Sequence, residues 1–298
     1  FFADTMMRYF LFQYGLIQLA ENSRSQRNWS ALGNLLEYYS SKIELTMKPI
    51  PLLGDTYFST GSFPYYRNLS IRLKPYYLIS IDQMDRPLFW PLALHEIAHC
   101  KLSETNHIQR LSATWHPEQI EPDLRAVVEA RIEESLCDII ATRLIGPSYP
   151  FAYITRLWAQ LPIGTSEHYP TQEFRIECMA TILDEVGLER IGQYIRQVRD
   201  QKLAGNWDRD PIAPLKDRLV SVVADIPCEL APDLYQQATN AKTQLNVNPP
   251  LDPTLLFMAS WLSFDEETPT KTEESISKLS SLIVDVLERR PKPLNSRA

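Results

Sequence analysis

The stretch that decides the fold is Leu94-His95-Glu96-Ile97-Ala98-His99-Cys100, which contains the pattern His-Glu-x-x-His. Its residues predict a helix, on which positions i and i+4 project from nearly the same angle. His95 and His99 can therefore offer imidazole nitrogens to one tetrahedral Zn²⁺. Glu96 would border the metal without binding it and could take a proton from a metal-bound water, which is the general-base step of peptide hydrolysis.

A third metal ligand is expected downstream, in the helical segment 132–141. Glu134 is the candidate, because it shares a stripe of that helix with apolar residues, and a buried carboxylate requires a cation or a hydrogen-bond donor. Asp138 follows one turn later and could accept the free ring N–H of a ligating histidine, which would fix its tautomer. Glu129 and Glu133 fall on a different arc and are predicted to be solvent-exposed charges.

These two blocks, His-Glu-x-x-His followed by Glu-x-x-x-Asp, resemble the gluzincin metallopeptidases. The segment 167–176 (EHYPTQEFRI) is similar to the His-Pro…Arg-Ile block of the CAAX prenyl protease family and its soluble minigluzincin relatives. The resemblance covers about residues 69 to 180. It departs from the family at Tyr169, inserted between His168 and Pro170, at Ala98, where glycine is frequent, and in having no membrane spans.

The resemblance implies a soluble zinc endopeptidase that acts on a protein or peptide substrate. It assigns His168 to the cleft as a catalytic hydrogen-bond donor to the oxyanion or the substrate carbonyl. Tyr169 is the alternative donor, and Arg175 could hold this segment against the site. In gluzincins a strand before the zinc helix pairs with extended substrate, and a strand here could do so or could simply cover the helix.

Composition narrows the classes of partner and compartment. The chain has 298 residues, a net charge of −7 and 44% hydrophobic residues, which is typical of a globular protein. The acidic balance argues against nucleic-acid and anionic-membrane partners. Four scattered cysteines without a Cys-x-x-Cys pair are predicted to be free core thiols, which favours a reducing, cytoplasmic location. No signal peptide or spanning segment is expected.

The expected fold is mostly α (α+β): a gluzincin-like zinc-helix core with a small antiparallel β hairpin or sheet and helical flanks. We expect an N-terminal helical segment at 1–50, the metallopeptidase core at 51–186 and a C-terminal helical region at 187–298. The hairpin is expected from strands at 69–73 and 76–81, after prolines that end the N-terminal unit. Helices are expected at 3–20, 27–47, 122–145, 174–186, 188–204, 213–225, 231–243, 253–263 and 275–290.

The sequence contains two further histidines before the candidate third ligand, and it is also compatible with two other functions. His107 and His116 lie in a segment expected to form a loop or short helix over the cleft, and they are predicted to be surface residues. The first alternative function is an interaction or sensor module that keeps the metal as a structural element and binds a protein partner through its helical flanks. The second is a regulated peptidase whose flanks hold it inactive.

Overall fold

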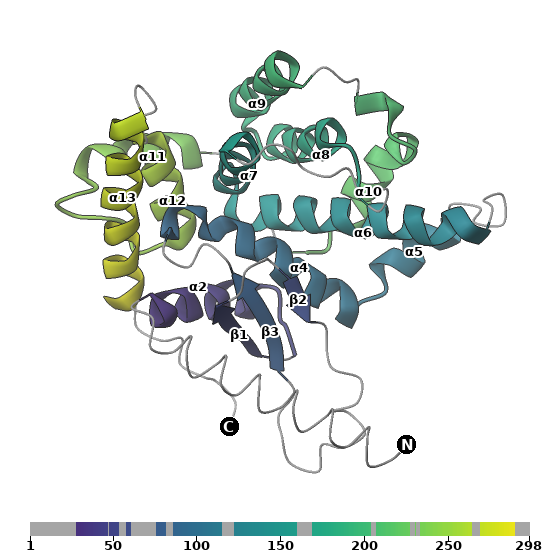
Figure 1. Cartoon of the computed structure of the whole chain (residues 1–298), viewed down its shortest axis with the longest axis horizontal. Helices are drawn as coiled ribbons and strands as arrows, with labels where there is room; N and C mark the ends of the chain where they lie inside the picture. The colour runs from purple at the N-terminus through teal and green to yellow at the C-terminus, as the bar shows by residue number, and fades with distance from the viewer. Residues whose placement is uncertain are drawn as a thin grey trace, which may run out of the picture.

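The computed structural model describes residues 28–46, 48–53, 58–60, 76–81, 86–114, 122–159, 169–203, 207–226, 230, 233–263 and 269–289. Within these ranges the fold is mostly helical with one small sheet, which confirms the expected class (Figure 1). No helix in the described part of the chain is long and apolar enough to cross a membrane. The expected helix at 3–20 lies outside the described residues.

The sheet has three strands in the order β1-β3-β2. They are β1 (Lys48–Leu53), β2 (Phe58–Thr60) and β3 (Tyr76–Ile81). Strand β3 runs antiparallel to β2 but parallel to β1, so the sheet is mixed, whereas an antiparallel hairpin or sheet was expected. The strand predicted at 76–81 is therefore confirmed, whereas its expected hairpin partner at 69–73 lies outside the described residues.

Strand β1 corrects the prediction for the prolines that follow the first helix. Pro49 and Pro51 do not simply end a helical unit but lie in this edge strand. Being two residues apart, they place their missing N–H groups on one side, which an edge strand tolerates. On that side the Pro51 carbonyl accepts a hydrogen bond from Trp29 Nε1 at 3.0 Å, which joins β1 to helix α2 (Trp29–Lys42).

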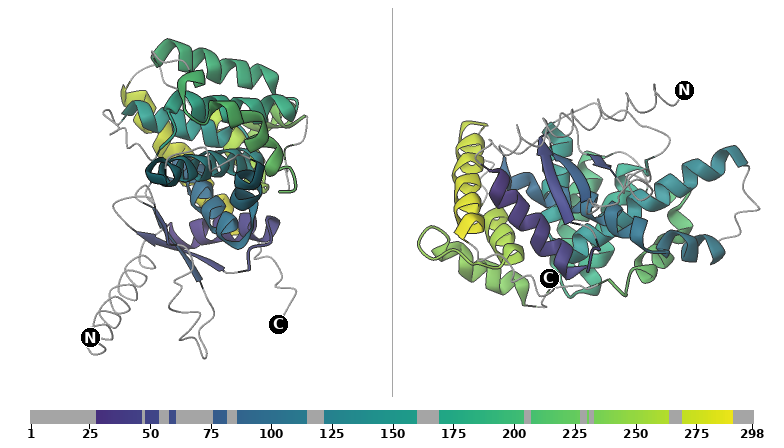
Figure 2. Two further views of the ribbon diagram at one scale, coloured as in Figure 1. Left: turned by 90° about the vertical axis from the view of Figure 1, so that its right-hand side faces the viewer. Right: turned by 90° about the horizontal axis from the view of Figure 1, so that it is seen from below.

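The helix of His95 and His99, α4 (Ala93–Glu104), lies between the sheet and the long helix α6 (Pro122–Ile145) (Figures 1 and 2). A 3-10 segment, η1 (Pro87–Leu92), leads into α4 and accommodates the prolines at both its ends. The apolar side chains of Leu94, Ile97 and Ala98 are fully buried. Burial on both sides fixes the direction in which the two histidines point.

Helix α6 has the bounds expected from the sequence. It ends before Gly146, whose φ of 64° suits glycine. The chain remains buried after this turn. Ser148 begins another helix, α7 (Ser148–Ala159), which the sequence analysis did not predict.

Most of the remaining helices form a layer on the far side of α6 from the sheet or a group beside the end of α2, whereas α5 (His107–Thr114) packs against α6 and α10 (Lys216–Val222) (Figures 1 and 2). Asn34 on α2 donates to the Leu287 carbonyl at 3.0 Å, and Tyr39 lies 2.9 Å from the Thr254 hydroxyl. The segments at the two ends of the described chain thus share one apolar core, which extends from Ala31 to Leu287. The other remaining helices are α8 (Gln172–Glu185), α9 (Glu189–Lys202), α11 (Leu234–Gln244), α12 (Pro253–Leu262) and α13 (Pro269–Arg289), with short 3-10 segments η3 (Trp207–Arg209) and η4 (Ala213–Leu215).

Candidate metal centre

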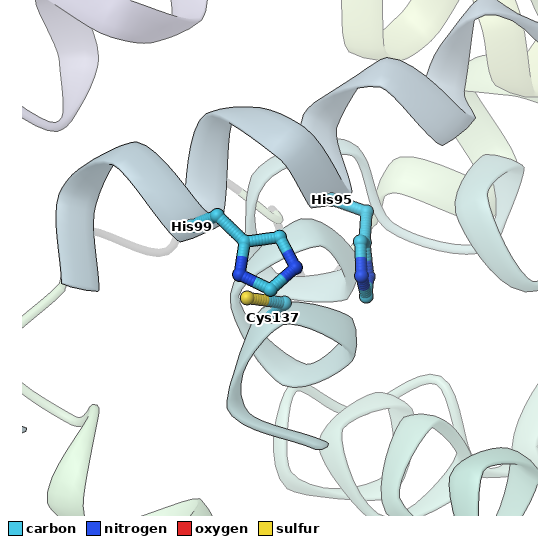
Figure 3. A group of neighbouring side chains, drawn as sticks. All are labelled: His95, His99 and Cys137. Carbon is cyan, nitrogen blue, oxygen red and sulfur yellow. The ribbon is translucent and has the colours of Figure 1, made fainter. Parts of the chain in front are cut away.

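The imidazoles of His95 and His99 lie one turn apart on the face of α4 that meets α6. Their ring centroids are 4.9 Å apart and the rings are nearly perpendicular, at 79°. Figure 3 shows the two rings side by side, with the sulfur of Cys137 next to His99. His95 is buried and His99 is partly buried, so the pair is largely shielded from solvent. One ring nitrogen of each histidine and the Cys137 sulfur lie within 4.8 Å of one another, and this group could hold a metal ion.

The carboxylate of Glu134 lies between the two rings. Its Oε2 is 3.1 Å from His95 Nε2, and its Oε1 is 3.4 Å from His99 Nε2. Zinc bonds of about 2.0–2.1 Å at tetrahedral angles separate neighbouring donor atoms by about 3.3 Å. Both Nε2 atoms therefore lie close to one carboxylate, at separations near those between donor atoms around a single metal ion.

Asp138 fixes the orientation of His95. The Nδ1 atom of His95 donates to Asp138 Oδ1 at 3.0 Å, which leaves Nε2 on the side of Glu134. The Tyr149 hydroxyl donates to the same oxygen and lies 3.1 Å from Nδ1. A carboxylate behind a ligating imidazole holds the ring and increases its basicity. Asp138 thus occupies the position behind the histidine for which it was proposed.

Arg175 joins α8 to this carboxylate. Its Nε donates to Asp138 Oδ2 at 2.6 Å, and its Nη2 donates to Oδ1 at 2.8 Å. Nη2 is also 3.8 Å from Glu134 Oε2, and the guanidinium lies 4.8 Å from the centre of the Tyr153 ring. Burial opposes ionisation of Asp138, but Arg175 and His95 outweigh it and lower the pKa of this carboxyl. Asp138 is therefore held as an anion.

The ligand candidates are also strongly coupled to one another. Burial lowers the pKa of His95, but the carboxylates of Glu134 and Asp138 outweigh it and raise that pKa to about 9. Burial likewise raises the pKa of Glu134, but His95, His99 and Arg175 bring it far below its usual range. Without a metal, protonated His95 and anionic Glu134 thus stabilise each other, and a divalent cation would have to replace the protons on the ligating nitrogens.

Cys137 is the residue of this cluster that the sequence analysis assigned only to the core. Its side chain is fully buried, and burial raises the pKa of the thiol to about 12, against the opposing effect of His99. It lies three residues after Glu134 on α6, so both project towards α4. That spacing was the available signal in the sequence. Tyr149 and Tyr153 were missed for a different reason, because helix α7 itself was not predicted.

Glu133 corrects a second prediction. It is not a charge that faces only solvent, because its Oε1 accepts a hydrogen bond from His99 Nδ1 at 2.8 Å. Its side chain remains 41% exposed. Each histidine therefore has a carboxylate on its Nδ1 side and Glu134 on its Nε2 side. Glu133 accepts the Nδ1 hydrogen bond of His99, as Asp138 accepts that of His95.

Of the predicted base and hydrogen-bond donors, Glu96 and Tyr169 lie within the described residues. Glu96 is buried on α4 between the two histidines in sequence. His168 lies outside the described residues. Tyr169, the alternative donor, is half-exposed, and its ring centre is 6.0 Å from the Arg175 guanidinium. The negative charge of Glu134 is the main cause of a raised pKa for Tyr169, so this hydroxyl lies within electrostatic reach of the centre.

His107 is not the surface residue that was expected. It is buried at the start of α5, where its Nε2 donates to Asp225 Oδ1 at 2.8 Å and its Nδ1 lies 2.6 Å from the Thr105 hydroxyl. Its partners show that it fastens α5 to the turn after α10 and does not join the histidine pair on α4. His116 lies outside the described residues.

No family model, curated protein or solved structure matches this chain. The resemblance to gluzincins therefore depends on the sequence motifs alone.

Proposed function

We propose that the chain is a zinc-dependent endopeptidase whose metal is held by His95, His99 and Glu134. The observation that supports this most directly is the placement of both Nε2 atoms 3.1 and 3.4 Å from the Glu134 carboxylate. Asp138 and Glu133 behind the two rings support it further, because ligating histidines usually donate their second N–H in this way.

In this proposal the metal, Glu96 and the pair Asp138 and Arg175 have separate roles in hydrolysis. The zinc ion would polarise the scissile carbonyl and lower the pKa of a bound water. Glu96 would act as the general base, taking a proton from the attacking water and returning it to the departing amine. Because Glu96 is buried beside the histidines, its carboxylate is shielded from competing solvent. Asp138 and Arg175 keep His95 fixed while charge develops.

The oxyanion that forms on the substrate requires a hydrogen-bond donor. The family block assigns this role to His168, and Tyr169 is the alternative. A placed donor contributes roughly 2.7–4 kcal/mol to the transition state. Tyr169 precedes α8, and its ring lies 6.0 Å from the guanidinium of Arg175. Arg175 in turn donates to Asp138, which connects Tyr169 to the centre. The proposed substrate is a protein or peptide. The proposed location is a reducing, cytoplasmic compartment, because Cys100, Cys137 and Cys178 are free thiols.

Comparison of the wild type with Glu96→Gln tests the reaction. We expect the variant to keep one zinc per chain and to lose cleavage of an unfolded protein substrate, because the amide keeps the shape of Glu96 but cannot accept a proton. Glu129→Gln is the matched control, because it makes the same change at an exposed position of α6. Cleavage by Glu96→Gln at the wild-type rate would refute the mechanism.

A second function is supported by Cys137. With His95, His99 and Glu134 it brings the number of candidate ligands to four, and structural zinc sites are four-coordinate and closed. The chain would then be an interaction or sensor module in which the metal stabilises the fold and the helical flanks bind a partner protein. Stable zinc binding together with no cleavage by any variant would favour this function.

A further inference from the structure

We propose that Cys137 is a fourth protein ligand of the resting metal site, and that its thiolate closes the position which a catalytic water would need. The ligand assignment stands on the His95, His99 and Cys137 cluster. Its consequence for catalysis rests on the peptidase function proposed above.

The placement of Cys137 supports this assignment in two ways. Its sulfur and one nitrogen of each histidine lie within 4.8 Å of one another (Figure 3). It also follows Glu134 by three residues on α6, so one helix presents a carboxylate and a thiol to the two imidazoles of the other. Its side chain is fully buried, so the sulfur is shielded from solvent.

The distances require only a small adjustment. Zinc–sulfur bonds of about 2.3 Å and zinc–nitrogen bonds of about 2.0–2.1 Å place sulfur and nitrogen about 3.6 Å apart at tetrahedral angles. A separation of at most 4.8 Å is reduced to that value by a movement of about 1 Å. On binding, the S–H bond breaks, its proton goes to solvent and the electron pair remains on sulfur as the ligand.

With Glu134 also bound, the site would have four protein ligands and no position for water. The peptidase would then be latent in its resting state, and hydrolysis would require the thiolate to leave while His95, His99 and Glu134 retain the metal. Removal of the Cys137 thiol should therefore open the site without emptying it. Cys100 provides a control, because it is also a fully buried cysteine next to one of the histidines, on α4, but is not part of the cluster.

The experiment replaces zinc with Co²⁺, whose absorption spectrum reports a bound thiolate through a sulfur-to-metal charge-transfer band. The wild type and Cys100→Ala should bind one Co²⁺ and show the band. Cys137→Ala should bind one Co²⁺, more weakly, and lose the band. X-ray absorption of the wild-type zinc protein provides a test without any variant, with one sulfur neighbour expected at about 2.3 Å.

The outcomes separate this inference from the proposed function. One bound metal without a sulfur neighbour in the wild type would overturn the assignment of Cys137, even if the protein cleaves peptides. A sulfur neighbour with no cleavage by the wild type or Cys137→Ala would retain the ligand and refute the peptidase. A sulfur neighbour with faster cleavage by Cys137→Ala than by Cys100→Ala would support both.

Discussion

Arg175 donates two hydrogen bonds to Asp138, at 2.6 and 2.8 Å, and this pair connects α8 to α6 directly behind the histidine pair. The Asp138 side chain is fully buried and that of Arg175 is 12% exposed. Because Asp138 also accepts the Nδ1 proton of His95, the orientation of that ring depends on a residue from a helix that carries no ligand.

Asp138→Asn should weaken zinc binding and destabilise the fold together. Loss of the carboxylate behind His95 is expected to reduce metal affinity about 10–100-fold. It also leaves a buried guanidinium without its charge partner, which costs about 3–5 kcal/mol of unfolding free energy. Competition with a chelator measures the first effect and urea unfolding of the metal-free protein the second. Tyr149→Phe removes one hydrogen bond to the same carboxylate and should cost only about 1 kcal/mol.

Glu134→Ala should lower the zinc affinity by more than the roughly 10–100-fold expected for a residue behind a ligand, and should therefore retain less than one zinc after gel filtration at micromolar protein concentration. Elemental analysis after gel filtration gives the metal content directly. Glu129→Ala, an exposed glutamate of the same helix, is the control and should retain one zinc. Full occupancy in Glu134→Ala would show that Glu134 is not a metal ligand and would leave His95, His99 and Cys137 as the ligand set.

His107→Ala should destabilise the fold by about 1–3 kcal/mol, because a buried imidazole with two hydrogen-bond partners is lost. Its zinc content should equal that of the wild type, since its partners are Thr105 and Asp225. A loss of zinc in a folded His107→Ala protein would contradict this assignment.

The pair formed by His107 and Asp225 should also contribute to acid sensitivity. The hydrogen bond from His107 is the main cause of a pKa of Asp225 below its usual value of 3.8, and Arg110 adds to it. A lowered pKa stabilises the folded state fully above about pH 4 and loses this contribution as the pH falls through the folded pKa. The difference in urea midpoint between the wild type and Asp225→Asn should therefore be larger at about pH 5 than at about pH 3.

Two glycines in helices should respond in opposite ways to alanine. A Cβ at Gly33 on α2 meets nothing within 4 Å, so Gly33→Ala should stabilise by about 0.5–1 kcal/mol. A Cβ at Gly192 on α9 would lie 2.2 Å from Asp184 Oδ1 and 3.1 Å from the Ala180 carbonyl of α8. Because Arg196 holds Asp184 at 2.7 Å, Gly192→Ala should destabilise by about 1–3 kcal/mol. Thermal unfolding of the two variants compares these effects.

The sequence predicted best those features that are local to one helix. The bounds of α6 followed from Pro122 at its start and Gly146-Pro147 at its end. The shared stripe of Glu134 and Asp138 followed from helical periodicity. The Gly146-Pro147 signal also concealed α7, because a terminator gives no information on whether the chain starts a new helix one residue later.

Features set by tertiary contact were not predictable in the same way. The parallel pairing of β1 with β3 joins segments more than twenty residues apart, and prolines in β1 obscured the strand. Glu133 looked like a solvent charge because only the position of α4 brings His99 to it. The burial of His107 likewise depends on Asp225, which is 118 residues away in the sequence.

Strand β1 closes one side of the sheet to other chains. Pro49 and Pro51 offer no N–H to an incoming strand, and the Pro51 carbonyl is already occupied by Trp29. Edge strands with free backbone groups recruit further strands and promote aggregation, and prolines at the edge prevent this. Among the described strands, the edge without prolines is therefore that of β2, which contacts α4, the helix that carries His95 and His99.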